Sequence, residues 1–183
     1  MIASDAEINK KAPEFTLNDS NGNKVKLSDY KNKWIVLEWV NFDCPFVKKH
    51  YNSKNMQTLQ KSYEQKGVVW LSICSSAPKK QGNFTEDMIN KKIWDFRAAP
   101  TAYLIDDKGE VGKKYGAKTT PEIFIINPKG ILVYAGAIDD IATPDESDLT
   151  KAKNYVKEVL DIGLAGKPVE PKTTKSYGCS VKY

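Results

Sequence analysis

The stretch WIVLEWVNFDCPFV, residues 34–47, joins a run of apolar residues to a helix start. Trp34 to Val40 has the composition of a strand that is buried on both faces, as in a parallel sheet. After a short loop, Pro45 stands where its fixed φ and missing N–H suit the first position of a helix. Cys44 is therefore expected at the junction between a buried strand and a helix N-terminus.

The rest of the chain alternates strand and helix patterns. Apolar residues mark one helix face from Val47 to Tyr63, and this helix is predicted to end at Gly67. Strands are predicted at Val68–Ile73, Ala102–Ile105, Glu122–Ile126 and Ile131–Ala135, and further helices after Thr85, at Glu110–Tyr115 and at about 147–162. Helical crossovers between the first strands and a hairpin at the end indicate an α/β fold with a mixed sheet.

Extensions are expected on both sides of this core. Two short alternating patterns between Ala12 and Tyr30 flank an Asn-Gly hairpin turn. The C-terminal tail, residues 167–183, is polar until Tyr177–Val181, whose apolar groups indicate an anchored segment, since they gain nothing in a disordered tail. Without an internal repeat, residues 1–183 are expected to form a single domain with a core at about 12–162.

The composition argues against two classes of partner. No apolar stretch is long enough to span a bilayer, so membrane insertion is not expected. The net charge of +5 comes almost entirely from lysine, because Arg97 is the only arginine. The lysines are scattered, whereas a nucleic-acid surface gathers basic and aromatic residues on one element, so no nucleic-acid partner is expected.

Cysteine and histidine usage limits the cofactor chemistry. The chain has three cysteines, Cys44, Cys74 and Cys179, and one histidine, His50. Their number and spacing fit neither a disulfide scaffold nor a zinc site, so reactive thiols are expected and no metal or other cofactor.

The N-terminus leaves the compartment open. It shows no intact signal peptide, but Ser4 and Ala6 suit the last positions of a clipped export signal. An exported or periplasmic protein and a cytoplasmic one both agree with the sequence.

Cys44 is the residue on which nucleophilic chemistry is expected. Active sites of open α/β sheets lie at the carboxyl ends of strands, and free N–H groups at a helix start favour a thiolate. Glu38 lies inside the same apolar run, where burial raises the pKa of a carboxylate and allows it to act as a base. The other interpretation of Glu38 is a strand-edge residue that reaches solvent or pairs with a lysine.

Several motifs resemble those of the thioredoxin-like superfamily. The opening stretch resembles the strand and active loop of these proteins, and residues 120–124, TPEIF, resemble their cis-proline strand. The chain is similar in particular to the redoxin (AhpC/TSA) peroxiredoxin-like group at residues 43–48, 75–78 and 178–182. The resemblance covers about residues 12–162 and implies a thioredoxin-like three-layer sandwich with a central mixed sheet.

The resemblance also implies roles for individual residues. Glu38 would accept and return protons beneath the disulfide. Pro121 would be cis, which would leave the Thr120 backbone free beside Cys44 to pair with an extended peptide. Pro45, Thr120 and Pro121 would together position the substrate.

The sequence departs from the family pattern at Val47, which takes the place of the second thioredoxin cysteine and of the peroxide-attacking cysteine of peroxiredoxins. A mixed disulfide on Cys44 therefore needs a thiol from outside the loop. Cys179 is one candidate, because about eleven extended residues from Pro168 reach roughly 35 Å. Cys74, at the end of a parallel strand, is the rival, and either cysteine could instead be an incidental or inert thiol.

Three functions agree with these residues. The leading hypothesis is a thiol–disulfide oxidoreductase in which Cys44 attacks a protein or small-molecule disulfide and an external thiol restores the reduced state. The second is a thiol peroxidase with Cys44 oxidised to sulfenic acid, and the third is a non-catalytic thioredoxin-fold binding module. The substrate, the electron donor and the oligomeric state stay open.

Overall fold

The computed structural model describes residues 5–183, so Ser4 of the expected clipped signal lies outside the described residues. The strands are β1 (Thr16–Asp19), β2 (Lys24–Lys26), β3 (Ile35–Trp39), β4 (Val69–Cys74), β5 (Ala102–Ile105), β6 (Thr119–Thr120), β7 (Glu122–Ile126), β8 (Leu132–Gly136), β9 (Lys172–Thr173) and β10 (Cys179–Ser180). The α-helices are α1 (Pro45–Asn52), α2 (Asn55–Glu64), α3 (Glu86–Phe96), α4 (Glu110–Tyr115) and α5 (Tyr155–Leu164), and the 3-10 helices are η1 (Leu27–Tyr30) and η2 (Glu146–Thr150).

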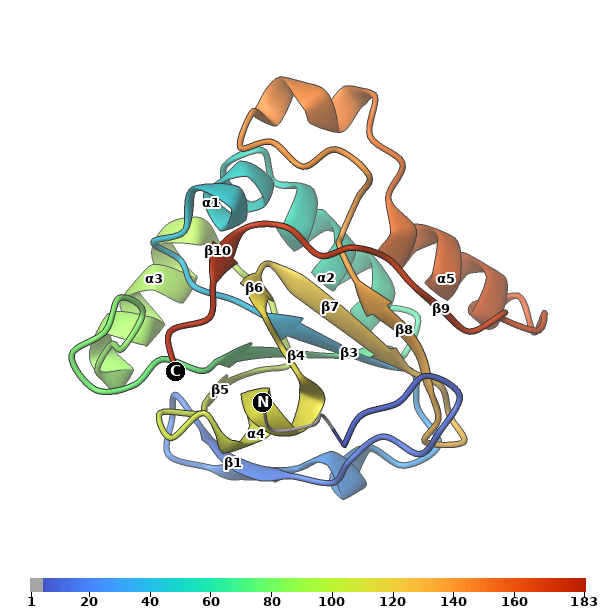
Figure 1. Cartoon of the computed structure of the whole chain (residues 1–183), viewed down its shortest axis with the longest axis horizontal. Coiled ribbons are helices and arrows are strands. Elements are labelled where there is room, and N and C mark those ends of the chain that lie inside the picture. The colour runs from blue at the N-terminus through green and yellow to red at the C-terminus, as the bar shows by residue number, and fades with distance from the viewer. Residues whose placement is uncertain (1–4) are drawn as a thin grey trace.

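The strands form an eight-stranded mixed sheet in the order β2-β1-β5-β4-β3-β7-β8-β9. Strands β3, β4 and β5 are parallel to one another, and β7 is antiparallel to both β3 and β8. Helices α1, α2, α3 and α5 pack on one face, whereas α4 and the N-terminal segment cover the other (Figure 1). This arrangement is the thioredoxin-like three-layer α/β sandwich expected from the sequence.

The central position of β3 in the sheet explains why its sequence does not alternate between apolar and polar residues. Its side chains point in turn to the two helical layers: Val36 packs with α1 and α2, and Leu37 packs with α4 on the opposite face. All five residues of β3 are buried. A strand covered on both sides has no solvent-facing position, so its sequence is a continuous apolar run interrupted only by Glu38.

The helix predicted from Val47 to Gly67 is in fact two helices. The chain breaks at Ser53 and at Lys54, which adopts a left-handed conformation with φ 64°. The Ser53 hydroxyl donates a 2.7 Å hydrogen bond to the Lys49 carbonyl, and this bond helps to end α1. The apolar spacing across the break is close to a helical repeat, which is why the interruption was not visible in the pattern.

The prediction of one helix at about 147–162 is wrong in its first half. Helix α5 begins only at Tyr155, because the side chain of Asn154 accepts a 2.9 Å hydrogen bond from the Lys157 N–H and caps the helix there. The preceding residues form the short helix η2, in which no residue is buried. None of the helices among residues 5–183 is long and apolar enough to cross a bilayer.

The carboxylate of Glu38 ties several elements to β3. Its Oε1 accepts a 2.8 Å hydrogen bond from the Tyr51 hydroxyl of α1. Its Oε2 accepts from the Trp70 Nε1 at 2.7 Å, the Ser72 hydroxyl at 3.0 Å and the Gln60 amide of α2 at 3.2 Å. Burial raises the pKa of Glu38, and these four donors offset only part of that rise. The buried Glu38 carboxyl group therefore connects the sheet to the helices that pack on it.

We expect Glu38→Gln to lower the free energy of unfolding by about 2–3 kcal/mol, because the new amide N–H₂ would face buried donors and leave at least one of them unpaired. Urea denaturation at neutral pH measures the change. Ser72→Ala is the matched control, since it removes only one of the four donors and should cost about 1 kcal/mol. Equal stability of Glu38→Gln and the unmodified protein would contradict this account.

Candidate active site

Cys44 occupies the N-cap position of α1, at the end of the loop that follows β3. The loop turns sharply because the Asn41 side chain accepts a 3.0 Å hydrogen bond from the Asp43 N–H and the Asn41 carbonyl accepts a 2.9 Å bond from the Cys44 N–H. Pro45 then begins the helix. The junction of a buried strand with a helix start, predicted from the sequence, is confirmed.

The strand that follows α4 approaches Cys44 from the other side. The Thr120–Pro121 peptide bond is cis, as the resemblance implied. The Cys44 thiol donates a 3.1 Å hydrogen bond to the Thr120 carbonyl oxygen. Thr120 and Pro121 are both buried, whereas Pro45 is exposed at the start of the helix.

The Thr120 backbone was expected to be free for an extended peptide, but the chain's own tail occupies it. Strand β10 pairs antiparallel with β6, so that Cys179 lies opposite Thr120 and Ser180 lies opposite Thr119. Figure 1 shows the tail crossing in front of the sheet to reach β6 beside the start of α1. Cys44 consequently has no exposed surface.

Backbone and side-chain hydrogen bonds hold the end of the tail after Cys179. The Val181 N–H donates to the Lys118 carbonyl at 3.0 Å, and the Lys182 carbonyl accepts from the Ala77 N–H at 2.8 Å. The Tyr183 hydroxyl donates a 2.7 Å hydrogen bond to the Ala117 carbonyl. These contacts hold the chain that directly follows Cys179, as expected for an anchored segment.

The electrostatics of the site favour a thiolate on Cys44. Burial opposes ionisation, but the hydrogen bonds of the Cys179 thiol and backbone and of the Val47 N–H in the first turn of α1 outweigh it and lower the pKa of Cys44. Burial, the hydrogen bond to Cys44 and the negative charge of Cys44 together raise the pKa of Cys179 to about 11. Cys44 is thus the thiol that ionises, and Cys179 is the one that keeps its proton.

Two other predicted site residues lie elsewhere. Cys74, at the end of β4, is buried, and its sulfur contacts the Ser76 hydroxyl and the Gly82 carbonyl, both at 3.4 Å. Burial raises the pKa of this thiol. The hydrogen bonds of Glu38 are those that join β3 to its neighbours, and none of those found for Glu38 or Cys74 is with Cys44. Strand pairing brings Cys179 to the Thr120 edge beside Cys44, whereas no hydrogen bond found for Glu38 or Cys74 reaches Cys44.

Sequence reasoning missed a buried polar cluster beside the site, which we call the Asp139 cluster: Lys49, His50, Asp139 and Tyr177. The Tyr177 hydroxyl donates a 2.6 Å hydrogen bond to the Asp139 carboxylate. The Lys49 ammonium lies 3.6 Å from the same carboxylate, and both side chains are buried. The only signal in the sequence was the aromatic residue in the anchored patch, because nothing in the spacing links α1 to the loop after β8.

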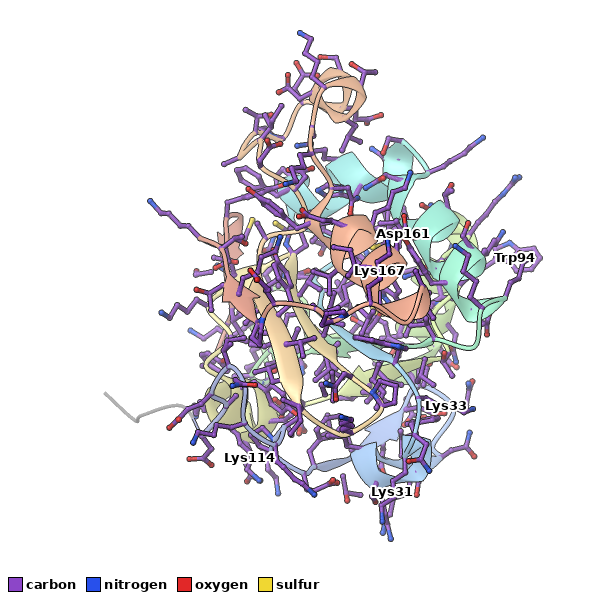
Figure 2. All side chains as sticks on the ribbon, turned by 90° about the vertical axis from the view of Figure 1, so that its right-hand side faces the viewer. Lys31, Lys33, Trp94, Lys114, Asp161 and Lys167 are labelled. Atoms are coloured by element: carbon purple, nitrogen blue, oxygen red, sulfur yellow. The ribbon has the colours of Figure 1, made fainter. Side chains whose placement is uncertain are left out.

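The labelled basic and aromatic side chains are spread over the surface of the described residues. The lysines labelled in Figure 2, such as Lys31, Lys114 and Lys167, lie on different sides of the molecule and form no single basic stripe. Trp94 of α3 is 81% exposed and projects outward (Figure 2). Among residues 5–183, no group of three or more His, Cys, Asp or Glu side chains is close enough together to hold a metal ion.

The fold and the cysteine at the helix start define a redoxin of the thioredoxin-like class. The AhpC/TSA family model matches residues 8–135, and the chain belongs to this family, whose members are thiol oxidoreductases. The tail that carries Cys179 lies beyond the matched residues.

Individual relatives are distant but cover much of the chain. The chain is 30% identical over 128 residues to the thiol-disulfide oxidoreductase ResA of Bacillus thuringiensis subsp. konkukian (strain 97-27). This alignment covers 69% of this chain and 68% of the relative. The chain is 27% identical over 118 residues to the peroxiredoxin Bcp of Bacillus subtilis (strain 168), with 60% and 63% covered. The crystal structure of an uncharacterized conserved protein from Geobacillus kaustophilus matches with a TM-score of 0.82 at 30% identity, over 97% of this chain and 92% of that chain.

We expect the pKa of Cys44 to lie below that of an ordinary cysteine and to rise when Cys179 is replaced by alanine, because the thiolate then loses a hydrogen-bond donor. The ultraviolet absorbance of the thiolate, followed as a function of pH in a Cys74→Ser background, reports the ionisation without requiring access to the sulfur. Cys74→Ser alone should leave the lower titration step in place. An unchanged midpoint in Cys179→Ala would show that the tail does not tune Cys44.

Proposed function

We propose that the protein is a thiol–disulfide oxidoreductase in which Cys44 is the nucleophile and Cys179 is the resolving thiol. The observation that supports this proposal is the pairing of Cys179 with Thr120, whose carbonyl oxygen accepts the hydrogen bond of the Cys44 thiol. The active loop has Val47 where thioredoxins have their second cysteine, and in this proposal the tail supplies that second thiol.

The chemistry follows ordinary thiol–disulfide exchange. The Cys44 thiolate attacks one sulfur of the substrate disulfide, the S–S bond breaks, and the second substrate sulfur leaves as a thiolate that takes up a proton from water. Cys179 then loses its proton and attacks the Cys44 sulfur of the mixed disulfide. The first substrate sulfur leaves as a thiolate, and a Cys44–Cys179 disulfide remains. An external dithiol returns two electrons and two protons to close the cycle.

The difference in pKa between Cys44 and Cys179 determines the order of these steps. While Cys44 is a thiolate, its charge and the hydrogen bond between the sulfurs help to keep the pKa of Cys179 at about 11, so Cys179 stays protonated. Once Cys44 is bound in a mixed disulfide, that charge and that hydrogen bond are gone, so the pKa of Cys179 falls. The resolving thiol becomes more acidic at the step that uses it.

The remaining site residues position the reacting groups in this proposal. Pro45 fixes the start of the helix that favours the thiolate, and Thr120 and Pro121 form the edge on which the partner cysteine pairs. The ResA relative carries the name of a thiol-disulfide oxidoreductase, which supports the same class of substrate here. Glu38, which makes no direct contact with Cys44, holds the elements of the site together.

We expect mild oxidation to produce a Cys44–Cys179 disulfide, because Cys179 pairs with Thr120, whose carbonyl oxygen accepts a hydrogen bond from Cys44. Mass spectrometry of a non-reducing digest identifies the pair. In a disulfide-reduction assay, Cys44→Ser should abolish activity, Cys179→Ser should accumulate a stable mixed disulfide, and Cys74→Ser should behave as the unmodified chain. A Cys44–Cys74 pair would refute the assignment of the resolving thiol, and full activity in Cys44→Ser would refute Cys44 as the nucleophile. The absence of disulfide reduction by the unmodified chain would favour a non-catalytic binding module.

The peroxiredoxin Bcp relative makes thiol peroxidase the second candidate. Peroxide would oxidise the Cys44 thiolate to a sulfenic acid, and Cys179 would condense with it to the same disulfide and release water. Stopped-flow mixing of reduced Cys179→Ser with hydrogen peroxide, followed by trapping of the sulfenic acid, tests this function. We expect no sulfenic acid on Cys44 within seconds, because Val47 stands at the position of the peroxide-attacking cysteine. Rapid sulfenic acid formation would favour the peroxidase.

A further inference from the structure

Tyr177 lies two residues before Cys179, and its hydroxyl is held in the Asp139 cluster. The hydroxyl donates a 2.6 Å hydrogen bond to Asp139 Oδ1, and its oxygen lies 3.3 Å from His50 Nε2. On the other side of the ring, His50 Nδ1 lies 2.9 Å from the side-chain nitrogen of Asn55. The side chains of His50 and Asp139 are buried.

The hydrogen bonds fix the direction in which each group donates. The Asn55 amide donates to His50 Nδ1, so Nε2 carries the ring proton of neutral His50 and donates it to the tyrosine oxygen. Burial, with the charge of Lys49, lowers the pKa of His50 to about 3, so the ring is neutral at physiological pH. The pocket therefore offers one buried donor and one buried acceptor to a single hydroxyl.

The walls of the pocket suit the aromatic ring of a tyrosine. The ring of Phe46, two residues after Cys44, meets the Tyr177 ring edge-on at 5.9 Å. The Lys49 ammonium lies 5.6 Å from the centre of the Tyr177 ring and donates a 2.9 Å hydrogen bond to the Ile141 carbonyl. A phenylalanine in this pocket would leave the His50 Nε2–H without a partner and would leave Asp139 Oδ1 with only the Ile141 N–H, which is costly in a buried site.

The residue between the tyrosine and the cysteine is restricted as well. Gly178 has φ +129°, a conformation that residues with a side chain rarely adopt. A Cβ added to Gly178 would lie against the backbone carbonyl of Thr120, far inside contact distance, and the Thr120 backbone cannot move away without disturbing Cys44. Glycine is thus required where the segment passes over the cis-proline strand.

A polypeptide substrate must bind to the surface that the tail occupies, at β6 beside Cys44. Cys44 has no exposed area while the tail is in place, and the tail cysteine occupies the edge of Thr120. To reach Cys44, the sulfur of a substrate has to take the position of Cys179, and the two residues before it then replace Gly178 and Tyr177.

We propose that the tail is a built-in copy of the substrate and that the Asp139 cluster is a specificity subsite for tyrosine. This inference rests on the proposed oxidoreductase function. The preferred substrates are extended polypeptide segments in which the disulfide-bonded cysteine follows Tyr-Gly. His50 and Asp139 form hydrogen bonds with the tyrosine hydroxyl, and the glycine avoids a steric clash with the Thr120 carbonyl. The cysteine sulfur then lies against the Cys44 sulfur.

Synthetic peptides test the subsite. The peptide Lys-Ser-Tyr-Gly-Cys-Ser-Val, joined through its cysteine to a chromogenic thiol, is mixed with the reduced full chain carrying Cys179→Ser, and release of the chromogenic thiol gives the rate constant. We expect the tyrosine peptide to react about tenfold or more faster than the same peptide with phenylalanine, because the buried pair reads the hydroxyl. A peptide with alanine in place of glycine should be slower still.

The outcomes separate the two proposals. A small chromogenic disulfide without any peptide serves as the reference for Cys44 itself. If it reacts and the tyrosine and phenylalanine peptides react at equal rates, the subsite is refuted and the oxidoreductase stands. If neither the small disulfide nor any peptide reacts, both proposals fail. Discrimination that persists undiminished in Asp139→Asn, in a variant shown to be folded by circular dichroism, would also overturn the assignment to this pocket.

Discussion

The backbone pairing of Cys179 with Thr120 is the constraint on which the site depends. It is made by only two residue pairs between β10 and β6, yet it places a second sulfur against Cys44 where the active loop has a valine. The pairing uses the free edge beside a cis proline, the kind of edge to which an extended peptide adds by strand pairing. In the proposed mechanism, Cys179 and a bound polypeptide therefore compete for one position.

This competition gives the tail two properties at once. It completes a dithiol when it is bound, and it shields Cys44 from solvent and from unrelated disulfides. Its anchors lie on both sides of the cysteine: Tyr177 is held by the Asp139 carboxylate, and Tyr183 is held by a backbone carbonyl. Because these anchors are individual hydrogen bonds to a partly exposed segment, the tail is held far less firmly than a strand of the central sheet.

Glu38 shows how the fold and the site share one polar network. In the middle of an apolar strand, its carboxylate collects four donors from α1, α2 and β4. A buried charge of this kind is tolerated only when its partners are in place, so it ties the helix that carries Cys44 to the sheet below it. The role of proton carrier that the sequence suggested for Glu38 stays a prediction, and the structure shows that its carboxylate links two helices to the sheet.

The sequence by itself determined the layered α/β fold, the strand that leads to Cys44 and the helix that starts at Pro45, and the resemblance of residues 120–124 to a family motif implied the cis bond before Pro121. These features are local, since apolar runs, turn residues and a motif are contiguous in the chain. The choice of Cys179 over Cys74, the closed tail and the tyrosine pocket were decided only by the tertiary structure. They depend on contacts between residues tens of positions apart. The spacing of apolar residues along the chain does not indicate which distant segment pairs with the edge of β6.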